Sequence, residues 1–304
     1  MDLKAINELC ADLEKKEGKG SVYKLGSKNS VRMIPRWSTG IEDLDNAIGG
    51  GIPQGRIIEI FGAESAGKTT LALWLAHLVE KALYIPTEGT FDTERALQMG
   101  NTKDNFLVYQ PDYGEQALNQ ILKFAKAGIP LIILDSVPAT QPREDIEKLE
   151  KDAQNQLRLG GVAALFAKML PTIVRTCEMT GTTLILINQV RDNIGAVMAF
   201  GDKDTTPGGR AIRFYSSIRI KVARRAWVEV PNKNPANSAA NEKIGMIMKC
   251  RVVKSKVSNP YLECEIPLLF DRGFTSFGEL QSIRQEIMKA NRSRKGKAKD
   301  DDQD

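Results

Sequence analysis

Histidine and cysteine are scarce in this sequence. It contains one histidine, His77, and four cysteines, Cys10, Cys177, Cys250 and Cys264, with no C-x-x-C spacing among them. A zinc site needs several such ligands at recognisable spacings, and a disulfide scaffold needs a high density of cysteines. The sequence therefore argues against both, and it favours reduced thiols in a cytosol. We interpret His77, which falls in a predicted helix, as a structural residue.

Long apolar runs are also missing. No stretch approaches the 18 or so consecutive apolar residues that a membrane-spanning helix requires. The first residues, Met1-Asp2-Leu3-Lys4, lack the basic and apolar regions of a secretory signal. We therefore expect a cytoplasmic protein with no membrane partner.

Charge of one sign does not dominate. The net charge of the 304 residues is +5, which is too mild to establish nucleic-acid binding, and 42% hydrophobic residues exclude a wholly disordered chain. Five basic residues between 292 and 299 are followed by four aspartates between 300 and 304. This segment is typical of a solvated tail without fixed structure, and the alternative is a tail that modulates access to an anionic partner.

Short apolar runs alternate with helix-like stretches from residue 57 onward. The runs predict strands at 57–61, 83–85, 131–134 and 183–187. The stretches between them predict helices at 69–79, 116–127 and 162–177, of which the last should be kinked or broken at Pro171. This alternation predicts an α/β fold with a mostly parallel central sheet flanked by helices.

The sequence signals for elements outside this alternation are weaker. Additional short strands, some of them antiparallel, are expected at 218–222, 244–253 and 262–267. Residues 2–16 predict an N-terminal helix whose apolar stripe must be buried against something, because an isolated helix of this length is marginal in water.

One motif carries strong chemical information. Residues 62–69 match G-x-x-x-x-G-K-[ST], and they follow a predicted strand and open a predicted helix. In such a loop the backbone amides surround phosphate oxygens, the lysine reaches the β- and γ-phosphates, and the hydroxyl of the last residue ligates Mg²⁺. We therefore expect ATP and Mg²⁺ as cofactors. The predicted nucleotide-binding residues are Gly62, Glu64, Ser65, Ala66, Gly67, Lys68, Thr69 and Thr70.

Two carboxylates follow predicted strands. Asp135 ends the apolar run 131–134, where it could share a metal ion with Thr69. Glu88 follows the run 83–85 and is the candidate for orienting or deprotonating the attacking water. From the residues alone, a solvated loop acid is an equally good interpretation of Glu88.

Two irregular stretches are candidates for binding. Residues 191–209 show no periodicity and mix apolar residues with glycines, as functional loops often do. Their apolar side chains either pack onto the body of the protein or insert between unstacked bases, with Arg191 and glycine amides on phosphates. The second stretch, 144–161, is charged and rich in amides.

The phosphate-binding loop (P-loop) at 62–69 is one of several blocks of residues that match a known family in the same order. The others occur at 50–60, 110–118, 135–137, 187–191, 205–209 and 252–256. On these blocks the sequence closely resembles the RecA recombinase family over about residues 2–280. The resemblance implies a RecA-like P-loop ATPase core at 37–280, an N-terminal helix and polymerisation segment at 1–36, and a terminal helix with a disordered tail at 281–304.

The resemblance assigns roles to individual residues. Glu88 corresponds to the family's catalytic glutamate, and Gln189 to the glutamine that senses the γ-phosphate at the root of a DNA-binding loop. Lys254 and Lys256 correspond to lysines that reach the ATP of the adjacent subunit. Catalytic roles are thus expected for Glu88, Lys68, Gln189, Lys254 and Lys256, and metal binding for Thr69 and Asp135.

The resemblance also implies DNA-binding and subunit-interface residues. The expected DNA contacts are Arg158, Leu159, Arg191, Ile194, Gly195, Gly208, Gly209, Arg210 and Arg213. The expected interface residues are Leu3, Ile6, Leu9, Leu13 and Phe214. In this interpretation the N-terminal helix packs on a neighbouring protomer.

Some positions depart from the family pattern. Arg95 stands where a tyrosine usually covers the adenine, so guanidinium stacking is expected there, while Asp92 keeps the carboxylate beside the adenine. Pro86 and Pro138 replace polar or small residues beside the catalytic strands. The family's C-terminal domain, which gathers duplex DNA, is not expected after residue 280.

The resemblance implies an ATP-dependent recombinase that forms a helical homo-oligomeric filament on single-stranded DNA and exchanges strands with homologous duplex DNA. Single-strand-binding or mediator proteins are further partners, and the expected location is the nucleoid, or a host cytoplasm for a phage-encoded protein. Two alternatives stay open: a regulatory ATPase that modulates another recombinase, and a DNA-coating module whose nucleotide is structural.

Overall fold

The computed structural model describes residues 2–17, 22, 34–89, 91–151, 160–192, 204–231 and 241–300. The chain divides into two compact units, residues 1–35 and residues 36–304. The first unit contributes the helix α1 (Leu3–Glu17), which matches the helix predicted at 2–16. Leu3 and Leu9 on this helix are 72% and 61% exposed.

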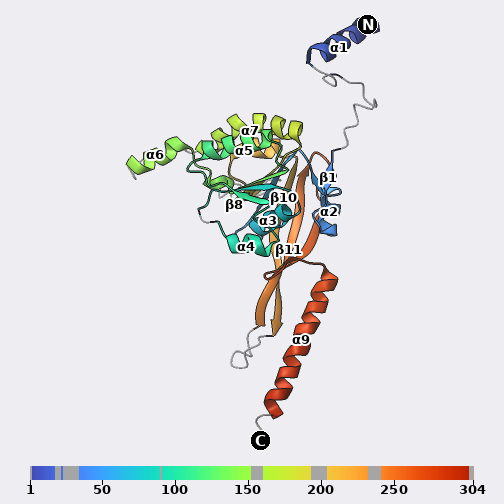
Figure 1. The fold of residues 1–304 in the computed structure, drawn as a ribbon, viewed down its shortest axis with the longest axis vertical. Helices are drawn as coiled ribbons and strands as arrows, with labels where there is room; N and C mark the ends of the chain where they lie inside the picture. Colours follow the sequence, from blue (N-terminus) through green and yellow to red (C-terminus); the bar gives the residue numbers. More distant parts are fainter. Residues whose placement is uncertain are drawn as a thin grey trace. The chain divides into compact units, whose positions relative to one another are not determined.

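The second unit is built on a nine-stranded sheet in the order β13-β12-β11-β10-β3-β7-β6-β4-β5 (Figure 1). The strands from β10 to β5 pair in parallel, and those from β10 to β13 pair antiparallel. This architecture confirms the predicted mostly parallel α/β fold. The strand bounds are β3 (Ile57–Gly62), β4 (Ala82–Pro86), β5 (Phe106–Val108), β6 (Leu131–Asp135), β7 (Thr183–Gln189), β10 (Ile218–Pro231), β11 (Asn241–Ser255), β12 (Glu263–Leu269) and β13 (Gly273–Phe274).

Alternate side chains of the central strands enter two separate cores. Ile58, Ile133 and Ile185 pack with α3 on one face, whereas their neighbours Ile57 and Leu184 pack with α5 and α7 on the other (Figure 1). A parallel strand covered on both faces needs apolar residues at consecutive positions, which explains the continuous runs in the sequence. The helices are α2 (Glu42–Ile48), α3 (Lys68–His77), α4 (Thr93–Gln98), α5 (Gly114–Lys126), α6 (Arg143–Lys151), α7 (Gly161–Thr180), α8 (Gly209–Tyr215) and α9 (Phe277–Asp300), with a 3₁₀ turn η1 (Val137–Ala139).

Four short strands, in two pairs, complete the fold. The strands β1 (Arg36–Trp37) and β2 (Ile52–Pro53) pair antiparallel beside α2. The strands β8 (Arg191–Asp192) and β9 (Asp204–Thr205) pair at the two ends of the stretch 193–203. The loop predicted at 191–209 therefore starts and ends in a small ribbon.

The structure differs from the sequence prediction at four elements. α7 runs through Pro171 without a break, because Phe166, Leu170 and Ile173 are fully buried around the proline and hold the helix against the sheet. β10 and β11 are much longer than predicted and form an extended antiparallel ribbon with register shifts. α9 continues to Asp300 through the basic segment for which no fixed structure was expected.

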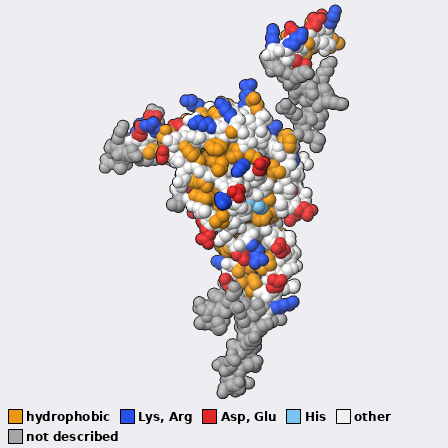
Figure 2. All heavy atoms as spheres, viewed as in Figure 1, with side chains coloured by type: hydrophobic (Ala, Val, Ile, Leu, Met, Phe, Trp, Pro, Cys, Tyr) orange, Lys and Arg blue, Asp and Glu red, His pale blue; other side chains and the backbone are white. Residues whose placement is uncertain are grey.

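The ribbon and α9 share a small apolar core. Val228 on β10 packs with Leu269 and Leu280, which come from β12 and α9. On the face seen in Figure 2, basic and acidic side chains are interspersed rather than separated. In the described part of the chain, no helix is long and apolar enough to span a membrane.

Candidate nucleotide-binding and catalytic site

The predicted P-loop joins the end of β3 to the start of α3. Gly67 caps α3 with φ 90°, a left-handed conformation that favours glycine. A Cβ atom on Gly62 would lie 2.1 Å from the carbonyl oxygen of Val222, so the neighbouring strand also requires glycine there. No described side chain caps the N-terminus of α3 by a hydrogen bond, which leaves its first amides facing the loop. This arrangement fits a nucleotide phosphate.

Lys68 lies folded over the loop. Its Nζ donates hydrogen bonds to the carbonyl oxygens of Gly62 at 3.1 Å and Ala63 at 2.8 Å. Burial lowers the pKa of Lys68, and the carboxylates of Asp135 and Glu88 oppose this shift. The ammonium group is therefore held at the mouth of the P-loop, where the sequence predicts contact with the phosphates.

The structure brings the two predicted metal-binding residues together. Thr69 Oγ1 donates a hydrogen bond of 2.7 Å to Oδ2 of Asp135, across 66 residues of sequence. Tyr84 on β4 donates a second hydrogen bond, of 2.6 Å, to the same oxygen. Burial raises the pKa of Asp135, and the hydrogen bonds from Tyr84 and Thr69 oppose this shift. A hydroxyl and a carboxylate oxygen side by side are hard ligands that suit Mg²⁺.

Tyr84 was not predicted as a site residue. Its side chain is almost fully buried, and burial together with the charge of Asp135 raises its pKa, so the hydroxyl stays protonated and acts as a donor. In the sequence it is one apolar-run residue among several, and its role depends on the adjacency of β4 and β6. Only the pairing of β4 with β6 could have revealed this role of Tyr84.

Glu88 is held by residues from two neighbouring strands. Oε1 of Glu88 accepts a hydrogen bond from Oγ of Ser136, which follows β6. The same oxygen accepts a hydrogen bond of 3.0 Å from Nε2 of Gln189 at the end of β7. Oε2 accepts no hydrogen bond from the described part of the chain and is available for a water molecule. Ser136 is a second site residue that the sequence prediction missed.

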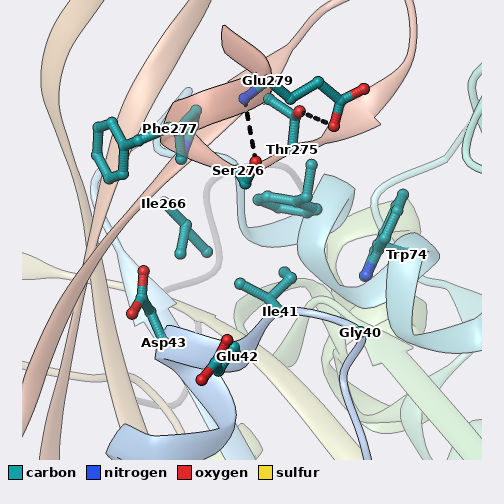
Figure 3. Close-up of a pocket in the computed structure, with 12 residues that line it drawn as sticks. Gly40, Ile41, Glu42, Asp43, Trp74, Ile266, Thr275, Ser276, Phe277 and Glu279 are labelled. Atoms are coloured by element: carbon teal, nitrogen blue, oxygen red, sulfur yellow. Dashed lines mark hydrogen bonds between the residues drawn. The ribbon is translucent and has the colours of Figure 1, made fainter. Parts of the chain in front are cut away.

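A cavity of about 220 Å³ connects these groups. It is lined by residues that include Thr69, Glu88, Asp92, Arg95 and Asp135. The P-loop hydroxyl, the metal-binding carboxylate and the expected catalytic glutamate thus face one space. A larger cavity of about 500 Å³ lies elsewhere, around Ile41, Ile266 and Trp74, and contains none of the predicted site residues (Figure 3).

Arg95 bridges α4 to the turn after β12. Its guanidinium donates to the carbonyl oxygen of Phe270 at 2.6 Å and to Oγ1 of Thr70 at 3.4 Å. Asp92 caps α4 by accepting a hydrogen bond of 2.9 Å from the backbone N–H of Arg95. Both residues border the cavity described above, and stacking of Arg95 on a base stays a prediction.

Lys254 and Lys256 lie at the end of β11 and contact α8. Lys254 Nζ donates to the carbonyl oxygens of Arg213 and Phe214, and Lys256 Nζ donates to that of Phe214 at 2.7 Å. Cations are favourable at a helix C-terminus. Burial, followed by the charges of Lys256 and Arg219, lowers the pKa of Lys254 to about 8. Phe214 itself is 67% exposed.

A buried polar cluster connects the P-loop strand to both ends of the 193–203 stretch. Glu59 on β3 is fully buried, and it pairs with Arg219 at 2.5 Å and accepts a hydrogen bond of 2.9 Å from Asn188. Nδ2 of Asn188 also donates to the carbonyl oxygen of Pro207 at 2.9 Å. The sequence prediction quoted Asn188 only as part of a block and did not assign it this role.

The structure describes some of the predicted DNA-binding residues and not others. Gly208 and Gly209 begin α8 with φ 85° and 74°, and Arg210 on the same helix is exposed. Arg213 is half-buried on α8, and the backbone of Arg191 pairs with Thr205. Arg158, Leu159, Ile194 and Gly195 lie outside the described residues.

Comparison with known proteins shows sequence similarity over most of the chain. The family model described as the RecA N-terminal domain matches residues 4–275. The proteins named Protein RecA from Staphylococcus aureus strains JH9, Newman and JH1 are each 38% identical to the chain over 289 residues. Each alignment covers 93% of this chain and 79% of the relative.

Proposed function

Because this chain belongs to the RecA family, whose members bind ATP and DNA and act in recombination and repair, we propose that it is a DNA-dependent ATPase. In this proposal it forms a filament on single-stranded DNA, pairs that strand with homologous duplex DNA and exchanges strands. The observation that carries the proposal is the hydrogen bond from Gln189 to Glu88. It links a residue at the start of the predicted DNA-binding loop to the residue expected to activate water.

Different residues of the chain have different roles in ATP hydrolysis. The P-loop amides and Lys68 bind the β- and γ-phosphates, while Thr69 and Asp135 would hold Mg²⁺, which offsets phosphate charge when bound. Glu88 orients the attacking water through Oε2 and takes its proton, since Oε1 is already engaged by Ser136 and Gln189. Desolvation by a neighbouring subunit would strengthen each of these interactions.

Two features support assembly into a filament. Lys254 and Lys256 contact α8 rather than any P-loop residue in the described part of the chain, so they are available to an adjacent subunit's nucleotide. The apolar stripe of α1 is exposed at Leu3, Ile6 and Leu9, as expected for a helix that packs on another protomer. In the proposal a complete catalytic site forms only between two subunits.

DNA binding would affect the catalytic site through the buried polar cluster around Glu59. Asn188 and Arg219 bind one carboxylate on β3, and Asn188 also bonds to Pro207 at the far end of the loop. Movement of either loop end on DNA would therefore shift the neighbouring Gln189 relative to Glu88. We place the activity on cytoplasmic DNA, with single-strand-binding or mediator proteins as further partners.

The test is ATP turnover with and without single-stranded DNA, combined with electron microscopy. We expect strong stimulation by DNA, filaments in the presence of ATP, and loss of strand exchange in Lys68→Ala. Absence of both stimulation and filaments would overturn the recombinase proposal. Stimulated turnover and filaments without strand exchange would favour the regulatory ATPase, and a fully functional Glu88→Gln would favour a structural nucleotide.

A further inference from the structure

Two of the four cysteines face each other across neighbouring strands. Cys250 on β11 is directly opposite Cys264 on β12 in the antiparallel register. Opposed residues point to the same face, with Cα atoms about 4.5 to 5.5 Å apart. This separation falls within the range of about 4.4 to 6.8 Å that disulfides span. The register therefore places the two residues within the Cα range of a cross-strand disulfide, which forms when small backbone shifts bring their Cβ atoms together.

The two thiols differ in accessibility. Cys250 is fully buried in the core, whereas Cys264 is half-buried. Cys264 also lines a surface hollow of about 460 Å³, together with Asn46, Asp43 and Phe277. Asp43 and Phe277 border the larger adjoining cavity as well, where Figure 3 labels both. A small molecule can thus reach Cys264, whereas Cys250 is fully buried and does not line the hollow.

The two thiols also differ in acidity. A hydrogen bond from Cys250 lowers the pKa of Cys264, although burial and the carboxylate of Asp43 oppose this shift. The same hydrogen bond and complete burial raise the pKa of Cys250 well above its ordinary value. Because the thiolate is the nucleophile in disulfide exchange, the accessible cysteine is also the more reactive one.

We propose that Cys264 is a modification site for low-molecular-weight disulfides such as oxidised glutathione, and that Cys250 resolves the adduct into a Cys250–Cys264 disulfide. In the first step the Cys264 thiolate attacks one sulfur of the reagent and expels one glutathione thiolate, which takes up a proton. In the second step Cys250 loses its proton, attacks the sulfur of Cys264 and expels the second glutathione. Two protein thiols lose two electrons in total, and one reagent disulfide becomes two thiols.

The proposal does not depend on the nucleotide site. The reacting pair lies on β11 and β12, and the P-loop follows β3, which is separated from β11 by β10. The bond would tie two neighbouring strands of the sheet in their existing register. Closing the connection between residues 250 and 264 restricts the unfolded chain, so the oxidised protein should melt at a higher temperature.

The experiment uses the folded full-length chain with Cys10→Ser and Cys177→Ser, so that only the proposed pair can react. After treatment with oxidised glutathione, unreacted thiols are alkylated under denaturing conditions and the intact mass and peptides are measured. We expect a loss of the mass of two hydrogen atoms, a cross-linked peptide pair containing residues 250 and 264, and reversal by dithiothreitol. The melting temperature should rise by several degrees on oxidation and return on reduction.

Single substitutions separate the two steps. Cys250→Ser should keep one glutathione on Cys264, because nothing resolves the adduct, and Cys264→Ser should acquire none. If the protein with both cysteines keeps two alkylatable thiols, or keeps a stable adduct on Cys264, the proposal is wrong. This test uses the protein that keeps both Cys250 and Cys264, so its result is valid even if Cys250→Ser or Cys264→Ser folds poorly.

Discussion

Nε2 of Gln189 donates a hydrogen bond of 3.0 Å to Oε1 of Glu88, although 101 residues separate them in the sequence. The two residues follow parallel strands, β7 and β4, with β6 between them. Parallel strands end at the same edge of a sheet, so side chains just after them converge. Gln189 also precedes the stretch that leads to the predicted DNA contacts, so under the proposed function this bond would connect DNA binding to ATP hydrolysis.

Removing this bond should uncouple DNA binding from hydrolysis. For Gln189→Ala we expect the stimulation of ATP turnover by single-stranded DNA to fall roughly tenfold or more, within the usual range of coupling between two sites. Nucleotide affinity should change little, because Gln189 lies beside Gly62 of the P-loop through its backbone and the substitution removes only its side chain. Stimulation is measured by steady-state ATPase assays, with Gln281→Ala on the exposed face of α9 as a control. Undiminished stimulation in Gln189→Ala would rule out this coupling.

The carboxylate of Glu88 should matter for turnover and not for binding. Glu88→Gln keeps the shape of the side chain and removes the proton acceptor, so kcat should fall roughly 10²- to 10⁴-fold. The affinity for a fluorescent ATP analogue should stay within about threefold of the original, since the P-loop is unchanged. Glu94→Gln, on the exposed side of α4, is the matched control. Equal turnover in both variants would show that Glu88 is not the proton acceptor.

Tyr84→Phe should weaken the metal site without emptying it. The change removes one of the two hydrogen bonds that orient Oδ2 of Asp135. Hydrogen bonds to charged groups contribute about 1.5–3 kcal/mol, so we expect a loss of stability of this order. The Mg²⁺ concentration for half-maximal ATP binding should rise several-fold. Tyr109 packs in the other core, so Tyr109→Phe is the control and should leave the Mg²⁺ dependence unchanged. Equal increases in the required Mg²⁺ concentration in both variants would show that Tyr84 does not position Asp135.

Lys254 should make stability depend on pH. Its pKa is lowered to about 8 in the folded chain, so between pH 8 and the ordinary lysine pKa the unfolded state binds more protons than the folded state. The free energy of unfolding therefore gains a contribution that increases with pH across this window. Lys254→Met should lack this contribution. The measurement is urea unfolding of both proteins from pH 7.5 to 10, and parallel pH curves would contradict the assigned shift.

The ion pair between Glu59 and Arg219 should be costly to break. Arg219→Met would leave a fully buried carboxylate without its cation, and such changes destabilise proteins by about 3–5 kcal/mol. Arg251→Ala removes an exposed pair with Glu263 at 3.3 Å, and it should cost at most about 1 kcal/mol. Urea unfolding compares the two variants directly. A similar cost for both would mean that Glu59 is protonated or hydrated once Arg219 is gone.

The P-loop, the succession of central strands and helices along the chain, and the position of Asp135 at the end of a central strand were predictable from the sequence. Each depends on local spacing, since the P-loop is one contiguous motif and each central strand is a continuous apolar run. The path of α7 through Pro171 and the length of the β10–β11 ribbon were not predictable. In both cases, packing against distant elements outweighs the local preference that the prediction used.

The sequence alone was enough to indicate the family and to predict the nucleotide and the residue types that would bind it, because these are encoded in short contiguous blocks. Tertiary structure decided which residues act together. Tyr84 meets Asp135, Gln189 meets Glu88, and Cys250 meets Cys264 only because particular strands are neighbours in a particular register. Strand order and register are properties of the whole sheet, and a one-residue slip would turn each of these side chains to the opposite face.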